Sequence, residues 1–98
     1  MRVELSEEAE ADLEAIADYI ARDNPVRALS FLLELRDRCN GLATFSERFP
    51  SVEHLGKANI RRCVHGNYLI FYQAGIEAVS ILHVRHGASD YRGLFDTN

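Results

Sequence analysis

The sequence predicts an α+β fold in which an N-terminal strand and a two-helix hairpin pack on a small antiparallel β-sheet. Three short apolar runs, rich in Val, Ile, Phe and Tyr and separated by turn residues, predict the sheet as a three-stranded meander. They span Ile60–Val64, Tyr68–Tyr72 and Ala78–Val84. The first half of the chain carries apolar residues at helical spacing, which supplies the cover that one face of such a sheet requires. With 98 residues, the chain is expected to form a single domain over residues 1–98.

The N-terminal quarter of the chain predicts a short strand followed by the first helix. Residues 2–5 alternate charged and apolar side chains, which is typical of a strand at a sheet edge. Ser6 is the expected N-cap of the first helix, because glutamates follow in its first turn and apolar residues between Ala9 and Ile20 recur at helical spacing. Asn24 then caps a second helix, with Pro25 at its first position.

The second helix is predicted to be longer, with apolar residues between Ala28 and Phe45 that form a surface wide enough for two neighbours. Asn40-Gly41 conflicts with this helix locally, because the pair favours a turn and a mid-helix Gly costs about 1 kcal/mol relative to Ala. We expect the helix to continue through the pair. Residues 46–57 then form the only sizeable predicted loop.

Tight turns join the predicted strands. Gly66-Asn67 is a two-residue connection whose leading Gly suits a type II′ turn, so the first two strands of the meander should form a tight hairpin. The second turn is expected to centre on Ala74-Gly75. After the last strand, Asp90–Phe95 is expected to form one helical turn that carries Tyr91 and Arg92.

Charge is distributed unevenly along the chain. The formal net charge of −4 argues against a protein that coats nucleic acid non-specifically, because such binding needs many Lys and Arg. Residues 1–50 hold 6 Arg against 11 Asp plus Glu, whereas residues 51–98 hold 5 Lys plus Arg against 4 Asp plus Glu. The sheet half is therefore the expected place for an anionic partner.

Several kinds of site have no sequence signature here. The chain has no phosphate-binding glycine loop and no nucleophile elbow, and we expect no cofactor. Cys39 and Cys63 lack a CxxC pattern and are expected to be reduced, buried residues. His83 and His86 are three residues apart on a predicted strand, so they should face opposite sides and are not expected to bind a metal. With no signal peptide and no apolar run long enough to span a membrane, the expected location is cytoplasmic.

The candidate functional residues are a group of hydrogen-bond donors. Arg61 and Arg62 point to opposite faces of their strand, so only one of them can join Arg85 and His86 on a common surface. If these residues converge with Tyr91, the cluster could hold a phosphodiester and shuttle protons without a metal. The alternative is that they rim the sheet and pair with acidic groups of the helices or of a partner chain.

Four segments, spread over most of the chain, resemble in their order and spacing the RelE/ParE superfamily of toxins from bacterial toxin–antitoxin pairs, and more specifically its ParE branch. The segments are EAEADLEAIADYI at Glu8–Ile20, NPVRALSFLLEL at Asn24–Leu35, GKANIRRCVHGNYLIFY at Gly56–Tyr72, and ILHVRHG at Ile81–Gly87, followed by Asp90. One position departs from the ParE pattern, because Ser89 stands where an Arg often precedes the Asp.

The resemblance implies a helical hairpin on a small antiparallel sheet, and a toxin that poisons DNA gyrase and has no active site. It also implies a cognate ParD-like antitoxin, whose tail wraps across the toxin while its other end binds DNA as a ribbon-helix-helix module. DNA would be contacted only through that antitoxin. A basic, aromatic-edged sheet surface suits an extended acidic peptide. The candidate partner contacts are Arg61, Arg62, Arg85 and Arg92.

The sister branch, which resembles RelE, implies a different activity, the ribosome-dependent cleavage of messenger RNA. Its members tend to be strongly basic and often carry an Arg at the position of Leu69, whereas this chain is acidic. A third hypothesis is a toxin-derived scaffold that has lost its activity. For the nuclease alternative, the candidate catalytic residues are Arg61, Arg85, His86 and Tyr91.

Overall fold

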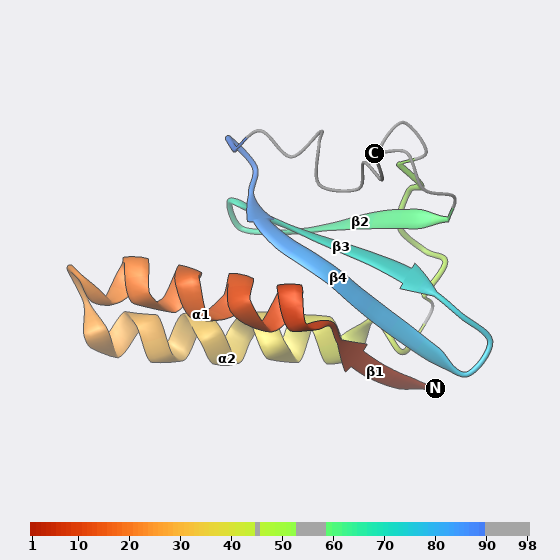
Figure 1. The fold of residues 1–98 in the computed structure, drawn as a ribbon, viewed down its shortest axis with the longest axis horizontal. Coiled ribbons are helices and arrows are strands. Elements are labelled where there is room, and N and C mark those ends of the chain that lie inside the picture. The colour runs from red at the N-terminus through yellow and green to blue at the C-terminus, as the bar shows by residue number, and fades with distance from the viewer. Residues whose placement is uncertain (45, 53–58, 90–98) are drawn as a thin grey trace.

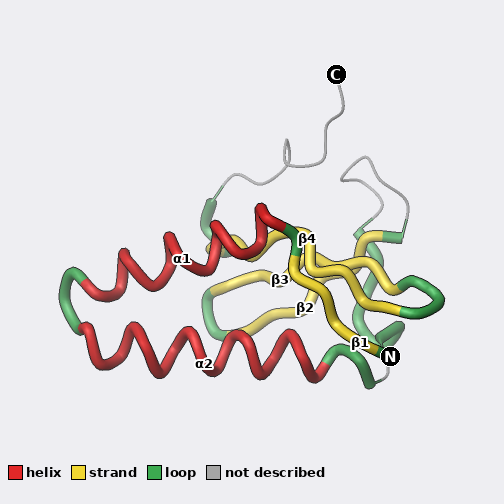
Figure 2. The backbone as a smooth tube through the Cα atoms, turned by 60° about the horizontal axis from the view of Figure 1, so that its bottom comes forward, coloured by secondary structure: helices red, strands yellow, loops and turns green. Residues whose placement is uncertain are grey.

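Two helices form one layer and a β-sheet forms the other in the computed structural model, which describes residues 1–44, 46–52 and 59–89 (Figure 1). The helices lie side by side, and β1 leads directly into α1 (Figure 2). This arrangement confirms the predicted α+β fold. The elements are β1 (Arg2–Leu5), α1 (Glu7–Ala21), α2 (Pro25–Gly41), β2 (Ile60–His65), β3 (Tyr68–Ala74) and β4 (Ala78–His86).

The sheet has the strand order β1-β4-β3-β2. Strands β2, β3 and β4 form the predicted antiparallel meander, and β1 lies at the edge as predicted. The sheet is mixed and not purely antiparallel, because β1 pairs with β4 in parallel. The helical hairpin separates β1 from the other strands in sequence, and a crossover of this kind allows a parallel pairing. β1 is short and pairs only with Ala78–Ile81, the first part of β4.

The main core lies between the helices and the sheet. Leu13 of α1 and Leu35 of α2 are fully buried against Ile70, Tyr72 and Ile81 of the strands. A smaller cluster contains Val52, Ile60 and Phe71. Because successive residues of a strand point to opposite faces, Phe71 lies on the face of β3 opposite to Ile70 and Tyr72, so both faces of the sheet bury apolar side chains.

The two cysteines are free and buried, as the sequence predicts. Burial raises the pKa of the Cys39 thiol to about 11, and the neighbouring Cys63 adds to this shift. Burial also raises the pKa of Cys63. Since the thiolate is the reactive form of cysteine, both side chains act as small apolar residues of the core.

Both predicted N-caps are confirmed. The Ser6 hydroxyl accepts the backbone N–H of Ala9 at 3.0 Å, and the Asn24 side-chain oxygen accepts that of Arg27 at 3.0 Å. A cap of this kind contributes about 1 kcal/mol. The two caps fix where the helical hairpin starts and where it turns.

The second helix includes Asn40 and Gly41, as expected, but the predicted extension beyond this pair is wrong, because α2 ends at Gly41. After it, Leu42, Ala43 and Thr44 each donate a backbone hydrogen bond three residues back, to Cys39, Asn40 and Gly41 respectively, at 3.1–3.2 Å. This is the bonding of a tight 3₁₀ turn, which commonly ends an α-helix. Gly favours the exit because it loses the most backbone freedom inside a helix. Phe45 lies outside the described residues.

The first sheet turn agrees with the prediction, whereas the second lies further along the chain. Gly66 has a φ of 58° and Asn67 has no positive φ, as a type II′ turn requires. Ala74 is still part of β3, and the second turn occupies residues 75–77, closed by the Gly75 N–H donating to the Ala78 carbonyl at 2.8 Å. The predicted helical turn at Asp90–Phe95 lies outside the described residues.

Candidate partner-binding groove

A groove of about 790 Å³ opens between the helix layer and the sheet. We call it the interlayer groove. Its walls are one face of α1, the start of α2, the turn between β2 and β3, and the end of β4. Most of its floor is apolar or aromatic, and its charged groups lie on α1, α2 and β4. The polar, aromatic and larger apolar side chains of its lining include those of Asp12, Ile16, Tyr19, Arg27, Phe31, Tyr68, Arg85 and His86.

The α1 wall follows from helical spacing. Asp12, Ile16 and Tyr19 are four and three residues apart, which places them on one face of the helix. Ile16 packs against the main core, whereas Tyr19 is 65% exposed. The face therefore runs from buried to exposed across its width, and it gives the groove an apolar side that is open to solvent.

A row of aromatic rings joins the two layers. The Phe31 ring of α2 lies 5.4 Å from the Tyr68 ring of β3 and 5.7 Å from the His65 ring of β2, measured between centroids. Tyr68 and His86 are direct partners across β3 and β4, and their rings meet edge to face at 5.2 Å. Each such pair contributes about 0.5–1.5 kcal/mol beyond the burial of its area. The row therefore fixes the shape of the groove.

Tyr68 is a hydrogen-bond donor in this setting and not a base. Burial raises the pKa of its phenol above the ordinary value, and the neighbouring Tyr19 phenol raises it further. The phenol thus keeps its proton at neutral pH. Its polar end can orient a bound group, but it cannot accept a proton from one without a strongly unfavourable charge.

Arg27 supplies a cation on the α2 wall. Its guanidinium carbon lies 5.0 Å from the centre of the Phe31 ring, and the same group forms an ion pair with Glu34. This pairing lowers the pKa of the exposed Glu34 carboxyl. The Arg27 guanidinium therefore lies near the Phe31 ring while it also binds the Ser30 hydroxyl and the Glu34 carboxylate.

Beyond the end of β1, residues at the start of α1 form hydrogen bonds with the backbone of the open edge of β4. Ser6 donates its backbone N–H to the Ile81 carbonyl at 3.0 Å and its hydroxyl to the Leu82 carbonyl at 2.9 Å. One turn and a half further along α1, the Asp12 carboxylate accepts the Val84 N–H at 2.9 Å. Unpaired backbone groups at a sheet edge are costly when they are buried. The groups of Ser6 and Asp12 therefore supply the hydrogen bonds that a longer β1 would make.

Asp12 also contacts the residues on either side of Val84. Its Oδ2 atom lies 2.9 Å from His83 Nδ1, and its Oδ1 atom lies 3.4 Å from Arg85 Nε. The side chains of Asp12 and His83 are each only 13% exposed. One largely buried carboxylate therefore hydrogen-bonds to His83 and Val84 and forms an ion pair with Arg85, whose Nε atom makes no hydrogen bond.

Of the residues predicted from the sequence, Arg85 and His86 come together in the interlayer groove. Arg61 lies elsewhere, because its guanidinium donates to the carbonyls of Glu47 and Phe49 at 3.0 and 2.6 Å and so ties down the segment after α2. Tyr91 and Arg92 lie outside the described residues.

The strand register decides which of the two adjacent arginines shares the face of Arg85. Arg62 pairs with Phe71 of β3, and Arg85 pairs with Leu69. Phe71 and Leu69 are two residues apart, so Arg62 and Arg85 belong to the same face of the sheet. Arg61, one residue from Arg62, belongs to the other. The predicted separation of the two arginines is therefore confirmed.

Sequence reasoning did not identify four groove residues, namely Asp12, Arg27, Phe31 and Tyr68. Asp12 had a usable signal: it lies next to Leu13 and four residues before Ile16, at the border of the apolar stripe of α1, where an acid is partly buried. The two aromatic residues gave no signal of their own, because aromatic residues at helix and strand spacing are most often part of a core.

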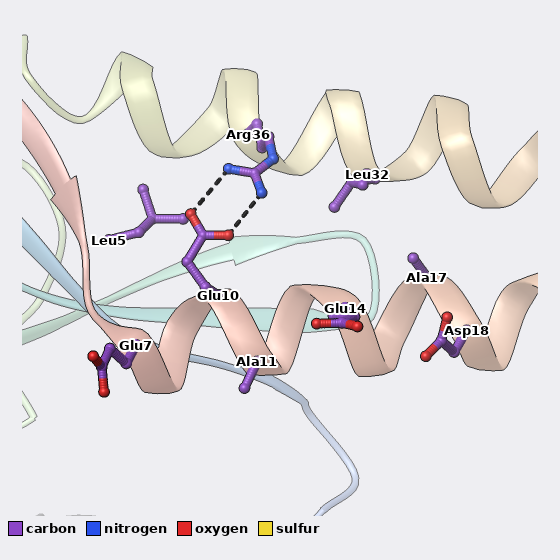
Figure 3. A pocket seen from close by; sticks show the side chains of 9 residues that line it. All are labelled: Leu5, Glu7, Glu10, Ala11, Glu14, Ala17, Asp18, Leu32 and Arg36. Atoms are coloured by element: carbon purple, nitrogen blue, oxygen red, sulfur yellow. Dashed lines mark hydrogen bonds and ion pairs between the residues drawn. The ribbon is translucent and has the colours of Figure 1, made fainter.

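A second hollow, of about 550 Å³, lies between the two helices and is lined by apolar residues together with four acidic ones and Arg36 (Figure 3). Arg36 donates to both carboxylate oxygens of Glu10, at 2.8 and 3.2 Å, whereas Glu7 lies away from this pair. The Arg36 hydrogen bonds lower the pKa of Glu10. The ion pair bridges α1 and α2 near the surface, where such pairs contribute at most about 1 kcal/mol.

Within the described part of the chain, no group of three or more His, Cys, Asp or Glu side chains is arranged to hold a metal ion. Neither helix in that part is long and apolar enough to cross a membrane.

Comparison with known proteins gives three similarities. A family model described as the ParE toxin of the type II toxin-antitoxin system, parDE, matches residues 3–91. Toxin RelE2 of Caulobacter vibrioides is 36% identical over 79 residues, which cover 80% of this chain and 85% of that toxin. A chain from the chromosomal ParDE TA system of P. aeruginosa has the same fold, with a TM-score of 0.76 at 18% identity, over 88% of this chain and 95% of that one.

Proposed function

Because the chain belongs to the ParE toxin family of type II toxin–antitoxin systems, we propose that it inhibits DNA gyrase and is neutralised by direct binding of a cognate, ParD-like antitoxin. The observation that carries the second half of this proposal is the interlayer groove. Its apolar and aromatic floor and its basic groups, Arg27, Arg85 and His86, suit a peptide segment that is both apolar and acidic.

The antitoxin is expected to carry a ribbon-helix-helix module that binds DNA, so this chain would meet DNA only through its partner. Arg85 is the foremost contact, and Arg62, which belongs to the Phe71 face of the sheet and does not line the groove, is a second. Arg61 and Arg92 are further proposed contacts. A toxin that acts on gyrase acts where chromosomal DNA lies, which makes the cytoplasm the proposed location.

Inhibition by binding, without catalysis, is supported by how the polar groups of the groove are used. The Asp12 carboxylate is shared among three groups of β4, and the Tyr68 phenol keeps its proton. The Arg61 guanidinium is bonded to backbone carbonyls. These three groups are therefore poorly placed for proton transfer to or from a phosphodiester.

One observation favours the second candidate function, a ribosome-dependent messenger RNA endoribonuclease. Arg85 and His86 do lie together, with the Tyr68 ring against His86, and a relative carries the name Toxin RelE2. A cation, an imidazole and a phenol are the residue types that metal-free phosphodiester cleavage requires. An experiment must therefore separate the two targets.

The test is induction of the toxin alone in a bacterial host, with and without the product of the adjacent reading frame. A DNA-damage reporter and mapped messenger RNA ends are measured together, and gyrase supercoiling is assayed with the purified toxin. We expect growth arrest, a damage response, intact messages and lost supercoiling, all reversed by the adjacent product. New ends within codons, without a damage response, would establish the nuclease. Undisturbed growth would indicate a scaffold that has lost its activity.

A further inference from the structure

The two ends of the Arg85 side chain have different surroundings. Its Nε atom is buried, and it is the atom of the guanidinium nearest to Asp12, 3.4 Å from Oδ1. The side chain as a whole is 39% exposed. A guanidinium carries five N–H donors in one rigid plane. Nε makes no hydrogen bond and contacts Asp12 only as an ion pair, and the fork formed by the two terminal nitrogens lies farther from that carboxylate.

The donors of this fork are not used within the described part of the chain. There, the one ion pair of the Arg85 guanidinium is with Asp12, through Nε, and its terminal nitrogens make no hydrogen bond to a described residue. Among the described residues that line the groove, Asp12 is also the only acidic one. Its Oδ2 atom is already bonded to Val84 and His83. Its Oδ1 atom forms the ion pair with Nε, and the described groove wall holds no second carboxylate for the terminal nitrogens.

We propose that Arg85 anchors a carboxylate of the bound antitoxin and that Asp12 is the residue that positions Arg85 for this contact. The inference rests on the proposed function and deepens it by naming the chemistry of the contact. A guanidinium fork matches a carboxylate in two parallel hydrogen bonds. Fixing the fork before binding removes part of the entropy cost of association.

The surroundings of Arg85 define the rest of the occupant. Tyr68 and His86 form an edge-to-face pair beside it, and Ile16 and Phe31 continue the apolar floor. A segment that fills this groove must carry apolar side chains next to the acidic residue. Either an amphipathic helix or an extended strand can present that combination, and both are known modes of peptide recognition.

The first experiment measures binding of the adjacent reading frame's product to toxin variants by calorimetry. We expect Arg85→Ala to weaken binding about tenfold, as the loss of one charge-assisted hydrogen-bonded contact does. Arg85→Lys keeps the charge but not the fork, and it should restore only part of the affinity. Arg2→Ala, an exposed arginine that pairs with Glu4 on β1, is the matched control and should bind as the wild type does.

The second experiment tests the positioning role of Asp12 by a double-mutant cycle. Asp12→Asn should weaken binding, while the pair Asp12→Asn with Arg85→Ala should bind no more weakly than Arg85→Ala alone. Additive losses would overturn the positioning role, because a general weakening of the fold would act independently of Arg85. Thermal unfolding of each variant checks that it is folded at the temperature of the assay.

A third set of variants identifies the carboxylate on the partner. Each Asp and Glu of the antitoxin tail is replaced by Asn or Gln, and one replacement should lose affinity against wild-type toxin but not against Arg85→Ala. Arg85→Ala binding within twofold of wild type would overturn the anchor. If wild-type toxin binds the adjacent product not at all, the proposed function fails instead, so the two failures are distinct.

Discussion

Asp12 of α1 accepts the backbone N–H of Val84 of β4 at 2.9 Å, across 72 residues of sequence. A helix side chain thereby completes the hydrogen bonding of a strand whose neighbour is too short. The same carboxylate binds His83 and faces Arg85. Asp12 thus contributes both to the stability of the fold and to the geometry of the candidate site. Substitutions can separate these two effects.

Replacing Asp12 tests the structural part of this relationship. Asp12→Ala leaves the largely buried Val84 N–H without its acceptor, so we expect a loss of about 1–3 kcal/mol in the free energy of unfolding. Asp12→Asn keeps an acceptor oxygen and should lose less. Urea unfolding followed by circular dichroism gives both values, with the exposed Asp18→Ala as the control. Equal, near-zero losses for both variants would mean that the edge contact is not stabilising.

Two glycines should respond to alanine in opposite directions. Gly66 has a φ of 58°, and a Cβ there would meet open space, so Gly66→Ala should destabilise the protein by about 1–2 kcal/mol through backbone strain alone. Gly41, at the end of α2, has no positive φ and equally open surroundings, so Gly41→Ala should stabilise by about 0.5–1 kcal/mol. Thermal unfolding measures both. A shift of the same sign for the two variants would contradict the assignment of strain to Gly66.

The raised pKa of Cys39 predicts both reactivity and the response to alkali. Because burial raises the pKa of this thiol to about 11 from an ordinary value near 9.0, the folded protein binds its proton more tightly than the unfolded chain does. The stabilising contribution is present below about pH 9 and is lost as the pH rises toward 11. Unfolding in urea at pH 8, 9 and 10 should show stability declining, and Cys39→Ala should reduce that decline. At pH 7.5, alkylation of both thiols should require unfolding.

Arg61 should matter more for stability than for binding. Its two hydrogen bonds to the Glu47 and Phe49 carbonyls fix the segment between α2 and β2. Hydrogen bonds from a charged group are the stronger kind, so Arg61→Ala should cost about 1–3 kcal/mol of unfolding free energy. The affinity of the Arg61→Ala variant for the antitoxin should fall less than that of the Arg85→Ala variant. A larger loss of affinity at Arg61 would move the main contact to the other face of the sheet.

Local signals predicted most of the fold. The capping residues Ser6 and Asn24, the alternation along β3 and the glycine of the first turn each act within a few residues, so the sequence around them contains the whole argument. The end of α2 was harder to predict from the sequence, because it depends on a balance of about 1 kcal/mol between a helix-disfavouring Gly41 and the apolar residues beyond it. The parallel pairing of β1 is a long-range outcome with no local signature.

The candidate site was predicted in part for the same reason. Arg85 and His86 are neighbours in the sequence, and their role as exposed donors follows from their strand. Whether Arg61 joins them depends on strand register, which a single sequence specifies only through the hydrophobic pattern. Asp12 could be placed beside them only after α1 was known to cover the open edge of β4, a contact between segments more than 70 residues apart.

The short first strand has a consequence for how the protein is made. Residues 2–12 leave the ribosome well before their partners on β4, which lie between Ala78 and Arg85. The nascent chain therefore carries an unpaired strand and an uncovered helix face until β4 has been made, and such contacts between distant segments form late. The interlayer groove has no β4 wall before that point, so an antitoxin that recognises this groove can bind only a chain in which β4 has already been made.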